Sequence, residues 1–144
     1  MGRHFPDTPW RLRRAPSLEE FERLADIAYT ELPEAVRALC GEIIIRITDF
    51  PDDDVLEEMG IDSPYDLLGL FQGTGIAQSG MIATGELPNM IWLYRRPLLD
   101  YWAESEETLG DLVTHVLVHE IGHHFGLSDD DMEAIEQAMD GVEV

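Results

Sequence analysis

LGDLVTHVLVHEIGHHFG, residues 109–126, is the stretch that decides the fold of this 144-residue chain. Its apolar residues recur at the three- and four-residue spacing of one helix face: Leu109, Leu112, Val113, Val116 and Leu117. We expect Ser105 to be the N-cap of this helix and Gly126 to end it in a left-handed conformation. The sequence therefore predicts a helix that packs one face against the core.

The same face becomes polar in the last turns of the helix. His119, Glu120 and His123 occupy positions that apolar residues hold two turns earlier. Two histidines four residues apart lie about 6 Å apart along a helix, so both can bind one ion. A glutamate between them can take a proton from a water on that ion, as in zinc hydrolases. The HExxH motif therefore predicts a zinc site with Glu120 as the catalytic residue.

The plain alternative is that these three side chains are core groups that hydrogen-bond to the backbone. For a single histidine we would favour that interpretation. Here two histidines and a glutamate share one inward face, and burying them without a metal would cost on the order of several kcal/mol. The combination therefore favours a metal site.

A catalytic zinc ion needs a third protein ligand. His115 lies on the same face, but His115, His119 and His123 together span about 12 Å of helix axis, too far for one ion. His124 points about 100° away from His123 and is excluded as well. The third ligand must therefore come from outside this helix.

Asp129 is the expected third ligand, because a turn at Gly126 would bring its carboxylate back to the metal. Its other role would be in a helix cap, next to a capping signal formed by Asp130 and Glu133. The remaining candidates for the third ligand are Asp130, Asp131 and Glu136.

From His119 to Asp129, the motif HExxHxxGxxD resembles the metzincin signature with aspartate in place of the third histidine. Met132 is the only nearby candidate for the methionine beneath the metal. The chain is more similar to a family of small bacterial proteins described as minimal zincin-like or metzincin-like domains. Outside the motif, the resemblance rests on Leu67–Gly73 and on Leu87–Pro97, and it spans about residues 65 to 132. It implies zinc and a peptidase-type site.

The expected function is a zinc-dependent metallopeptidase, with zinc on His119, His123 and Asp129 and with Glu120 as general base. Two other functions remain open: a non-catalytic zinc-binding regulatory or interaction domain, and a zinc hydrolase of a non-peptide amide. The same residues would serve all three.

Two further pairs of residues are weaker candidates for the site. Tyr94 or Tyr101 would be the oxyanion donor, although a core or surface aromatic is the commoner role. Arg95 and Arg96 would hold a substrate carboxylate, although salt bridges are the commoner role for them.

Length and composition predict one small domain. Residues 1–16 are expected to be an irregular arm without the apolar core of a signal peptide, and residues 17–144 a single zincin-like domain. Cys40 is the one cysteine, so no internal disulfide can form and a cytoplasmic location is expected. No apolar run is long enough for a membrane span, and the oligomeric state is left open.

The formal net charge of −21 narrows the choice of partners. All nine basic residues are arginines, and none follows Arg96. Such a chain repels phosphate backbones, so no nucleic-acid partner is expected. A peptide or protein substrate, by preference a cationic one, is expected instead, although solubility is the plainer role of the charge. The aspartate triplets 52–54 and 129–131 lack the spacing of a calcium loop.

The remaining patterns predict an α+β fold, in which a small sheet of about three strands packs on the metal-binding helix with additional helices around it. The expected elements are helices over about 17–31 and 33–40, an inner strand Ile43–Ile47, a short acidic helix from Asp52, strands Leu67–Phe71 and Met90–Arg95, and a mobile loop over 73–89.

Overall fold

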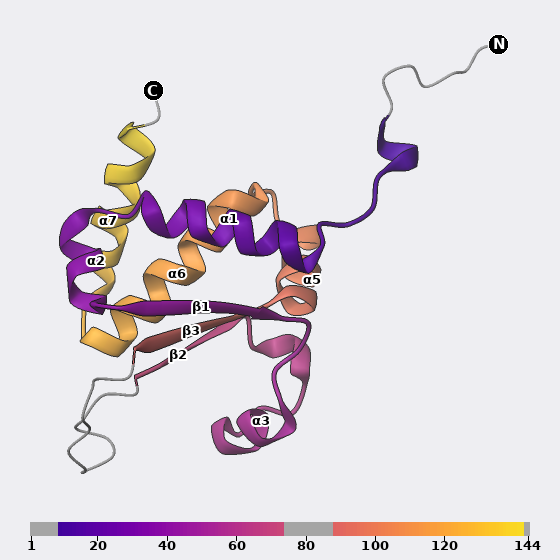
Figure 1. Cartoon of the computed structure of the whole chain (residues 1–144), viewed down its shortest axis with the longest axis horizontal. Coiled ribbons are helices and arrows are strands. Elements are labelled where there is room, and N and C mark those ends of the chain that lie inside the picture. Colours follow the sequence, from indigo (N-terminus) through magenta and orange to yellow (C-terminus); the bar gives the residue numbers. More distant parts are fainter. Residues whose placement is uncertain (1–8, 74–87, 143–144) are drawn as a thin grey trace.

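The computed structural model describes residues 9–73 and 88–142 of the chain. Its helices, shown in Figure 1, are α1 (Leu18–Thr30), α2 (Glu34–Cys40), α3 (Asp53–Met59), α5 (Arg95–Glu104), α6 (Leu109–Phe125) and α7 (Asp129–Val142). Two short 3-10 turns, η1 (Pro9–Leu12) and η2 (Pro64–Asp66), complete the helical elements. None of the helices in this part of the chain is long and apolar enough to cross a membrane.

Three strands form one mixed sheet in the order β1-β3-β2. The strands are β1 (Ile43–Thr48), β2 (Gly69–Gln72) and β3 (Asn89–Tyr94). β1 pairs with β3 in parallel and β2 pairs with β3 antiparallel. The α+β class with a small three-stranded sheet is therefore confirmed. Most of the loop expected over 73–89, and the first eight residues of the arm expected over 1–16, lie outside the described residues.

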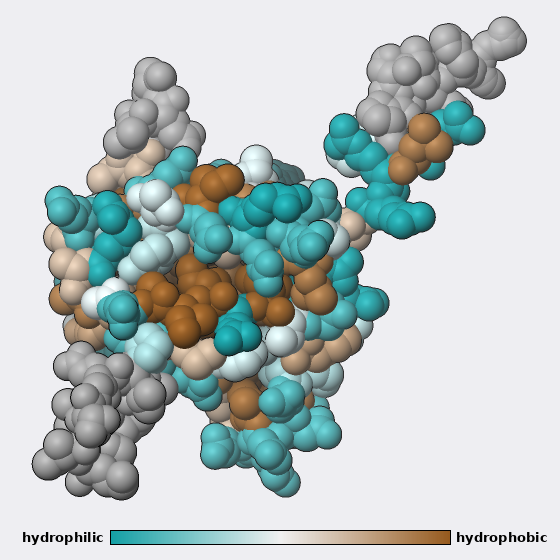
Figure 2. Space-filling model, viewed as in Figure 1, coloured by the Kyte–Doolittle hydropathy of each residue, from teal (hydrophilic) through white to brown (hydrophobic). Residues whose placement is uncertain are grey.

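The first strand is an edge strand, so the expectation of an inner strand at Ile43–Ile47 was wrong. Ile47 is buried, but Ile44 is 37% exposed and Arg46 points into solvent. Figure 2 shows hydrophobic residues gathered over β1 on this side of the molecule. The β-branched residues favour a strand, but they do not require that neighbouring elements bury both faces of that strand.

α5 was not expected, and it changes where the helix that carries the HExxH motif begins. The strand expected to continue to Arg95 ends at Tyr94, and the chain turns directly into a helix. Pro97, in the first turn of α5, has the backbone angle that a helix start requires. Ser105 ends α5, so its expected role as N-cap of the next helix was wrong. The N-cap of α6 is Thr108, which accepts a hydrogen bond from the Asp111 amide.

α1 and α6 pack side by side on one face of the sheet, α1 over β1 and α6 over β2 (Figure 1). The odd-numbered residues of the central strand β3 point into this layer, and Ile91 and Leu93 are fully buried there. From α6, Leu117 and Ile121 are fully buried in the same core. The apolar stripe expected in residues 109–117 therefore holds α6 against the sheet, which leaves its last turns for the polar residues.

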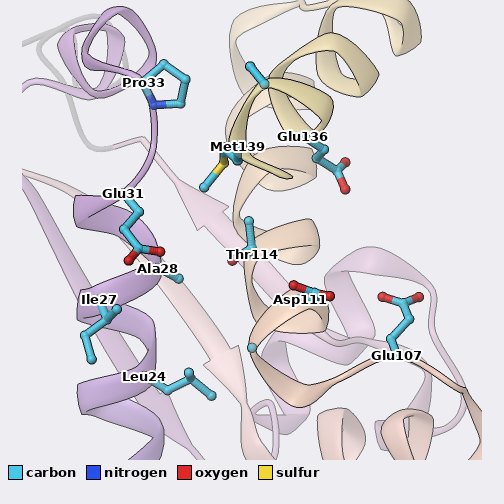
Figure 3. Close-up of a pocket in the computed structure, with 12 residues that line it drawn as sticks. Leu24, Ile27, Ala28, Glu31, Pro33, Glu107, Asp111, Thr114, Glu136 and Met139 are labelled. Carbon is cyan, nitrogen blue, oxygen red and sulfur yellow. The ribbon is translucent and has the colours of Figure 1, made fainter. Parts of the chain in front are cut away.

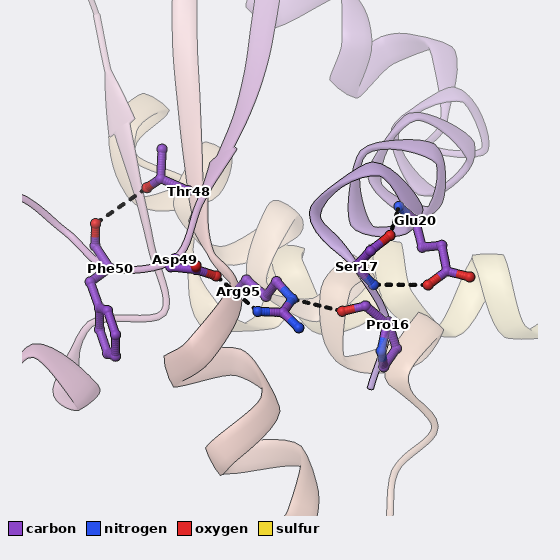
Figure 4. Close-up of polar contacts among 7 residues, drawn as sticks. All are labelled: Pro16, Ser17, Glu20, Thr48, Asp49, Phe50 and Arg95. Atoms are coloured by element: carbon purple, nitrogen blue, oxygen red, sulfur yellow. Dashed lines mark hydrogen bonds and ion pairs between the residues drawn. The ribbon is translucent and has the colours of Figure 1, made fainter. Parts of the chain in front are cut away.

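Two anchors hold the start of α1 and the start of α5 in place (Figure 4). Ser17 caps α1, since its hydroxyl accepts from the Glu20 amide while the Glu20 carboxylate accepts from the Ser17 amide. Arg95 donates to the Pro16 carbonyl at 2.6 Å and pairs with Asp49 at 2.9 Å. Arg95 therefore forms a salt bridge, the commoner of the two roles considered for it.

At Gly122, α6 packs tightly against Met132 of α7. A Cβ atom at this position would collide with the thioether of Met132, which is 1% exposed. Gly110, in the first turn of the same helix, has its nearest neighbour at 3.8 Å from the Cβ position, an ordinary contact.

We expect Gly122→Ala to destabilise the metal-free protein by about 1–3 kcal/mol, because α7 must shift to accommodate the added methyl group. Gly110→Ala is the matched control, and it should be neutral or stabilising by up to about 1 kcal/mol through helix propensity. Urea denaturation of both variants gives the two values. Equal stabilities would mean that Met132 does not constrain position 122.

Candidate metal centre

The polar end of α6 carries the residues of the HExxH motif in the arrangement that the helix period predicts. Gly126 ends the helix with φ of 76°, in the left-handed region. His119 is half-buried and His123 is exposed. Their rings are 5.8 Å apart between centroids and 82° apart in plane, so they are not stacked on each other. Two imidazoles placed in this way can turn one nitrogen each toward a common ion.

The donor set at this end of the molecule fits zinc. Imidazole nitrogens and carboxylate oxygens are both ordinary zinc ligands, with bonds of about 2.0–2.2 Å. His119 and His123 supply the nitrogens from α6, and the first turns of α7 supply several carboxylates. The residues present would therefore hold a zinc ion without any thiolate.

A second arrangement involves His115, which the spacing argument had set aside. His115 and His119 lie 4.0 Å apart between ring centroids. The Glu136 carboxylate bonds both rings, at 2.9 Å to His115 Nδ1 and 3.2 Å to His119 Nε2. Among the residues that the structure describes, only these three form a group of metal-ligand atoms that all lie within 4.8 Å of one another. Glu136 was one of the alternatives for a third ligand, whereas the role of His115 was missed.

Glu120 lies on the side of α6 that contacts β2. Burial raises the pKa of Glu120 above its ordinary value, against the opposing effects of His123 and of a hydrogen bond from the Phe71 backbone. His124, on the next turn, stacks on the Phe71 ring with centroids 4.1 Å apart. His124 therefore faces β2 and not the expected metal site, as its helical position predicted.

Asp129 is the first residue of α7 and is exposed. The expected capping pair of Asp130 and Glu133 was wrong. The reciprocal pair is Ser128 and Asp131, in which each backbone amide donates to the other side chain, at 3.0 and 3.1 Å. Because Asp129 is not part of this pair, its carboxylate is free of the capping role weighed for it. The metal-binding role of Asp129 stays a prediction.

Two aromatic side chains were considered as oxyanion donors, and they lie in different surroundings. Tyr94, at the end of β3, is 2% exposed, and burial together with the charges of Asp52 and Glu120 raises its pKa to about 12. Tyr101 is 48% exposed on α5. Tyr94 therefore keeps its proton at neutral pH, and the oxyanion role considered for either tyrosine stays a prediction.

A groove of about 840 Å³ lies between α1, α6 and α7 (Figure 3). Its apolar lining includes Leu24, Ile27, Ala28 and Met139, and its acidic lining includes Glu31, Glu107, Asp111 and Glu136. None of the three HExxH side chains lines it. Figure 3 shows Met139 extending into the groove toward α1, while the Glu136 carboxylate points away from α1.

Comparison with known proteins agrees with the motif and the fold. No curated protein matches the chain. A protein-family model described as zincin-like metallopeptidase matches residues 40–139, a range that includes the whole sheet and α6 and most of α7. The chain belongs to the zincin-like metallopeptidase family.

Proposed function

We propose that this protein is a zinc-dependent peptidase in which His119, His123 and Asp129 hold the metal and Glu120 is the general base. The observation that supports it most directly is the HExxH helix itself. Its two imidazoles share one face, and between them lies the carboxyl of Glu120, whose pKa burial raises. The family adds that this is a metallopeptidase fold.

The contacts between α6 and α7 support Asp129 as the third ligand. Glu136 of α7 contacts His119 of α6. About one turn earlier in α7, Met132 packs against Gly122, which is almost one turn later in α6. The two helices therefore run past each other in opposite directions. Asp129 lies about one turn before Met132. Viewed down the axis of α7, Asp129 and Glu136 point in directions within about 20° of each other. This progression brings Asp129 to the level of the last turn of α6, which carries His123.

The chemistry follows from what each group supplies. A bound zinc ion supplies Lewis acidity that makes a water molecule acidic near neutral pH. Glu120, whose pKa is raised by burial, would accept a proton from a water molecule that attacks the peptide carbonyl. The same carboxyl then delivers the proton to the leaving amine. Tyr94 keeps its proton at neutral pH and would donate to the carbonyl oxygen as charge develops there.

The edge of the sheet next to α6 offers a place for an extended peptide. β2 is the outermost strand on that side, and the Tyr94 amide donates to the Leu68 carbonyl. In an antiparallel pair such bonded positions alternate, so the backbone groups of Gly69 and Phe71 point away from β3. The Phe71 amide already reaches Glu120. A substrate that paired with this edge would therefore pass beside the catalytic glutamate.

Glu120→Gln tests the peptidase directly. The variant should bind zinc as wild type does, because Glu120 is not a ligand, while peptide hydrolysis falls by about 10²- to 10⁴-fold through loss of the base. Cleavage of a broad peptide library and elemental analysis give the two readouts. If wild type loaded with zinc cleaves no peptide, the protein is a zinc-binding domain or acts on another amide.

Asp129→Ala tests the ligand set. Wild type should contain about one zinc ion per chain, and in a chain that already carries Glu136→Gln, which removes the carboxylate shared by His115 and His119, Asp129→Ala should weaken zinc binding at least about 10- to 100-fold. Asp130→Ala is the matched control, since it removes the neighbouring exposed charge and should change the stability by about 0.5 kcal/mol or less. Competition with a chromophoric chelator measures both affinities. Unchanged affinity in Asp129→Ala would assign the third ligand to another carboxylate.

Substrate preference should follow the charge of the chain. The net charge of −21 should attract cationic peptides and repel acidic ones, and screening over about 8 Å at physiological salt should weaken this preference. Cleavage rates of matched arginine-rich and glutamate-rich peptide pools, measured at low and high salt, check the expectation. Equal rates at low salt would limit the role of the charge to solubility.

A further inference from the structure

Three histidines follow one another along one face of α6, at positions 115, 119 and 123. Each neighbouring pair has its own geometry: the rings of His115 and His119 are 4.0 Å apart, and those of His119 and His123 are 5.8 Å apart. The three rings span too much of the helix for one ion, but each pair can contribute two nitrogens. His119 belongs to both pairs.

A carboxylate completes the first pair. The two oxygens of Glu136 reach one nitrogen of each ring, His115 Nδ1 and His119 Nε2. These atoms are the ones that would bind a metal, and the three residues offer two nitrogens and one oxygen within 4.8 Å of one another. The side chains of His115, His119 and Glu136 are 47%, 29% and 28% exposed, so an ion from solvent can reach them. This is the minimum protein ligand set of a zinc site.

His119 cannot serve both pairs at once. Its Nε2 atom faces Glu136 in the structure, and a neutral imidazole has only one nitrogen with a free lone pair, because the other ring nitrogen carries a proton. An ion on His115, His119 and Glu136 therefore removes a ligand from the HExxH position. The two positions exclude each other through this one imidazole.

We propose that His115, His119 and Glu136 form a second zinc position that competes with the HExxH position for His119. An ion held there would lie toward the preceding turn of α6, which carries His115, and away from His123 and the start of α7 at Asp129. Such a chain contains zinc but lacks the ligand arrangement that the peptidase requires. The division of zinc between the two positions would set the fraction of chains that are active as a peptidase. Only this last consequence depends on the proposed peptidase function.

The test uses a variant in which the first position is destroyed. His123→Ala removes one ligand from the HExxH position and none from the second one, so the variant should still bind about one zinc ion per chain. Addition of zinc should shift the His115 ring signals in NMR spectra. Adding Glu136→Gln to His123→Ala should weaken zinc binding by at least about 10- to 100-fold.

Two further variants complete the design. His123→Ala combined with Glu133→Gln is the matched control, because Glu133 is an exposed carboxylate of the same helix, and its zinc affinity should equal that of His123→Ala. His123→Ala combined with His115→Ala removes a ligand at an exposed helix position and should lose zinc as the Glu136 variant does. Circular dichroism of the metal-free proteins establishes that all variants are folded.

The outcomes separate this proposal from the peptidase. Loss of all zinc binding in His123→Ala, or zinc binding there that Glu136→Gln leaves unchanged, would overturn the second position whatever the enzyme activity. Loss of zinc on Glu136→Gln in the otherwise wild-type chain would also overturn it, since Glu136 would then be the third ligand of the HExxH ion. If the wild-type chain cleaves no peptide while His123→Ala still binds zinc, the result would count against the peptidase alone.

Discussion

The burial of one face of α6 against the sheet is the interaction on which the rest of the structure depends. Leu117 and Ile121 hold the helix in the core, and the helix period places His119, Glu120 and His123 together, two turns after Leu112, Val113 and Val116. A rigid helix sets the spacing of the two imidazoles, so the chain needs no flexible segment to bring them together. The same rigidity explains why His115 is placed next to His119.

α7 is the second element of the centre, and its position depends on a small residue. Gly122 lets Met132 pack directly against α6, in the middle of the HExxH motif. This close contact brings the acidic face of α7 alongside the histidines, where Glu136 already bonds two of them. A larger side chain at position 122 would separate the carboxylates from the imidazoles. The placement of these candidate metal ligands and the packing of the two helices are thus coupled through one glycine.

The surroundings of Glu120 act on its pKa in opposite directions. Burial raises its pKa, while the Phe71 amide and His123 keep it from rising further. Proton transfer is most effective when the pKa of the base lies near the working pH. The neutral hydroxyl group of Tyr94 stands in the same electrostatic environment. In the proposed mechanism the sheet, which supplies Phe71 and Tyr94, would therefore contribute to the chemistry as well as to the fold.

Local sequence patterns were enough to predict the α+β class, the helix over 109–125, its left-handed end at Gly126 and the shared face of His119, Glu120 and His123. These features depend on local periodicity and on residues a few positions apart, which a sequence states directly. Only the tertiary structure decided that β1 is an edge strand, that Arg95 starts a helix, and that Glu136 joins His115 to His119. Such features depend on how distant segments pack, and each lone segment is compatible with more than one arrangement.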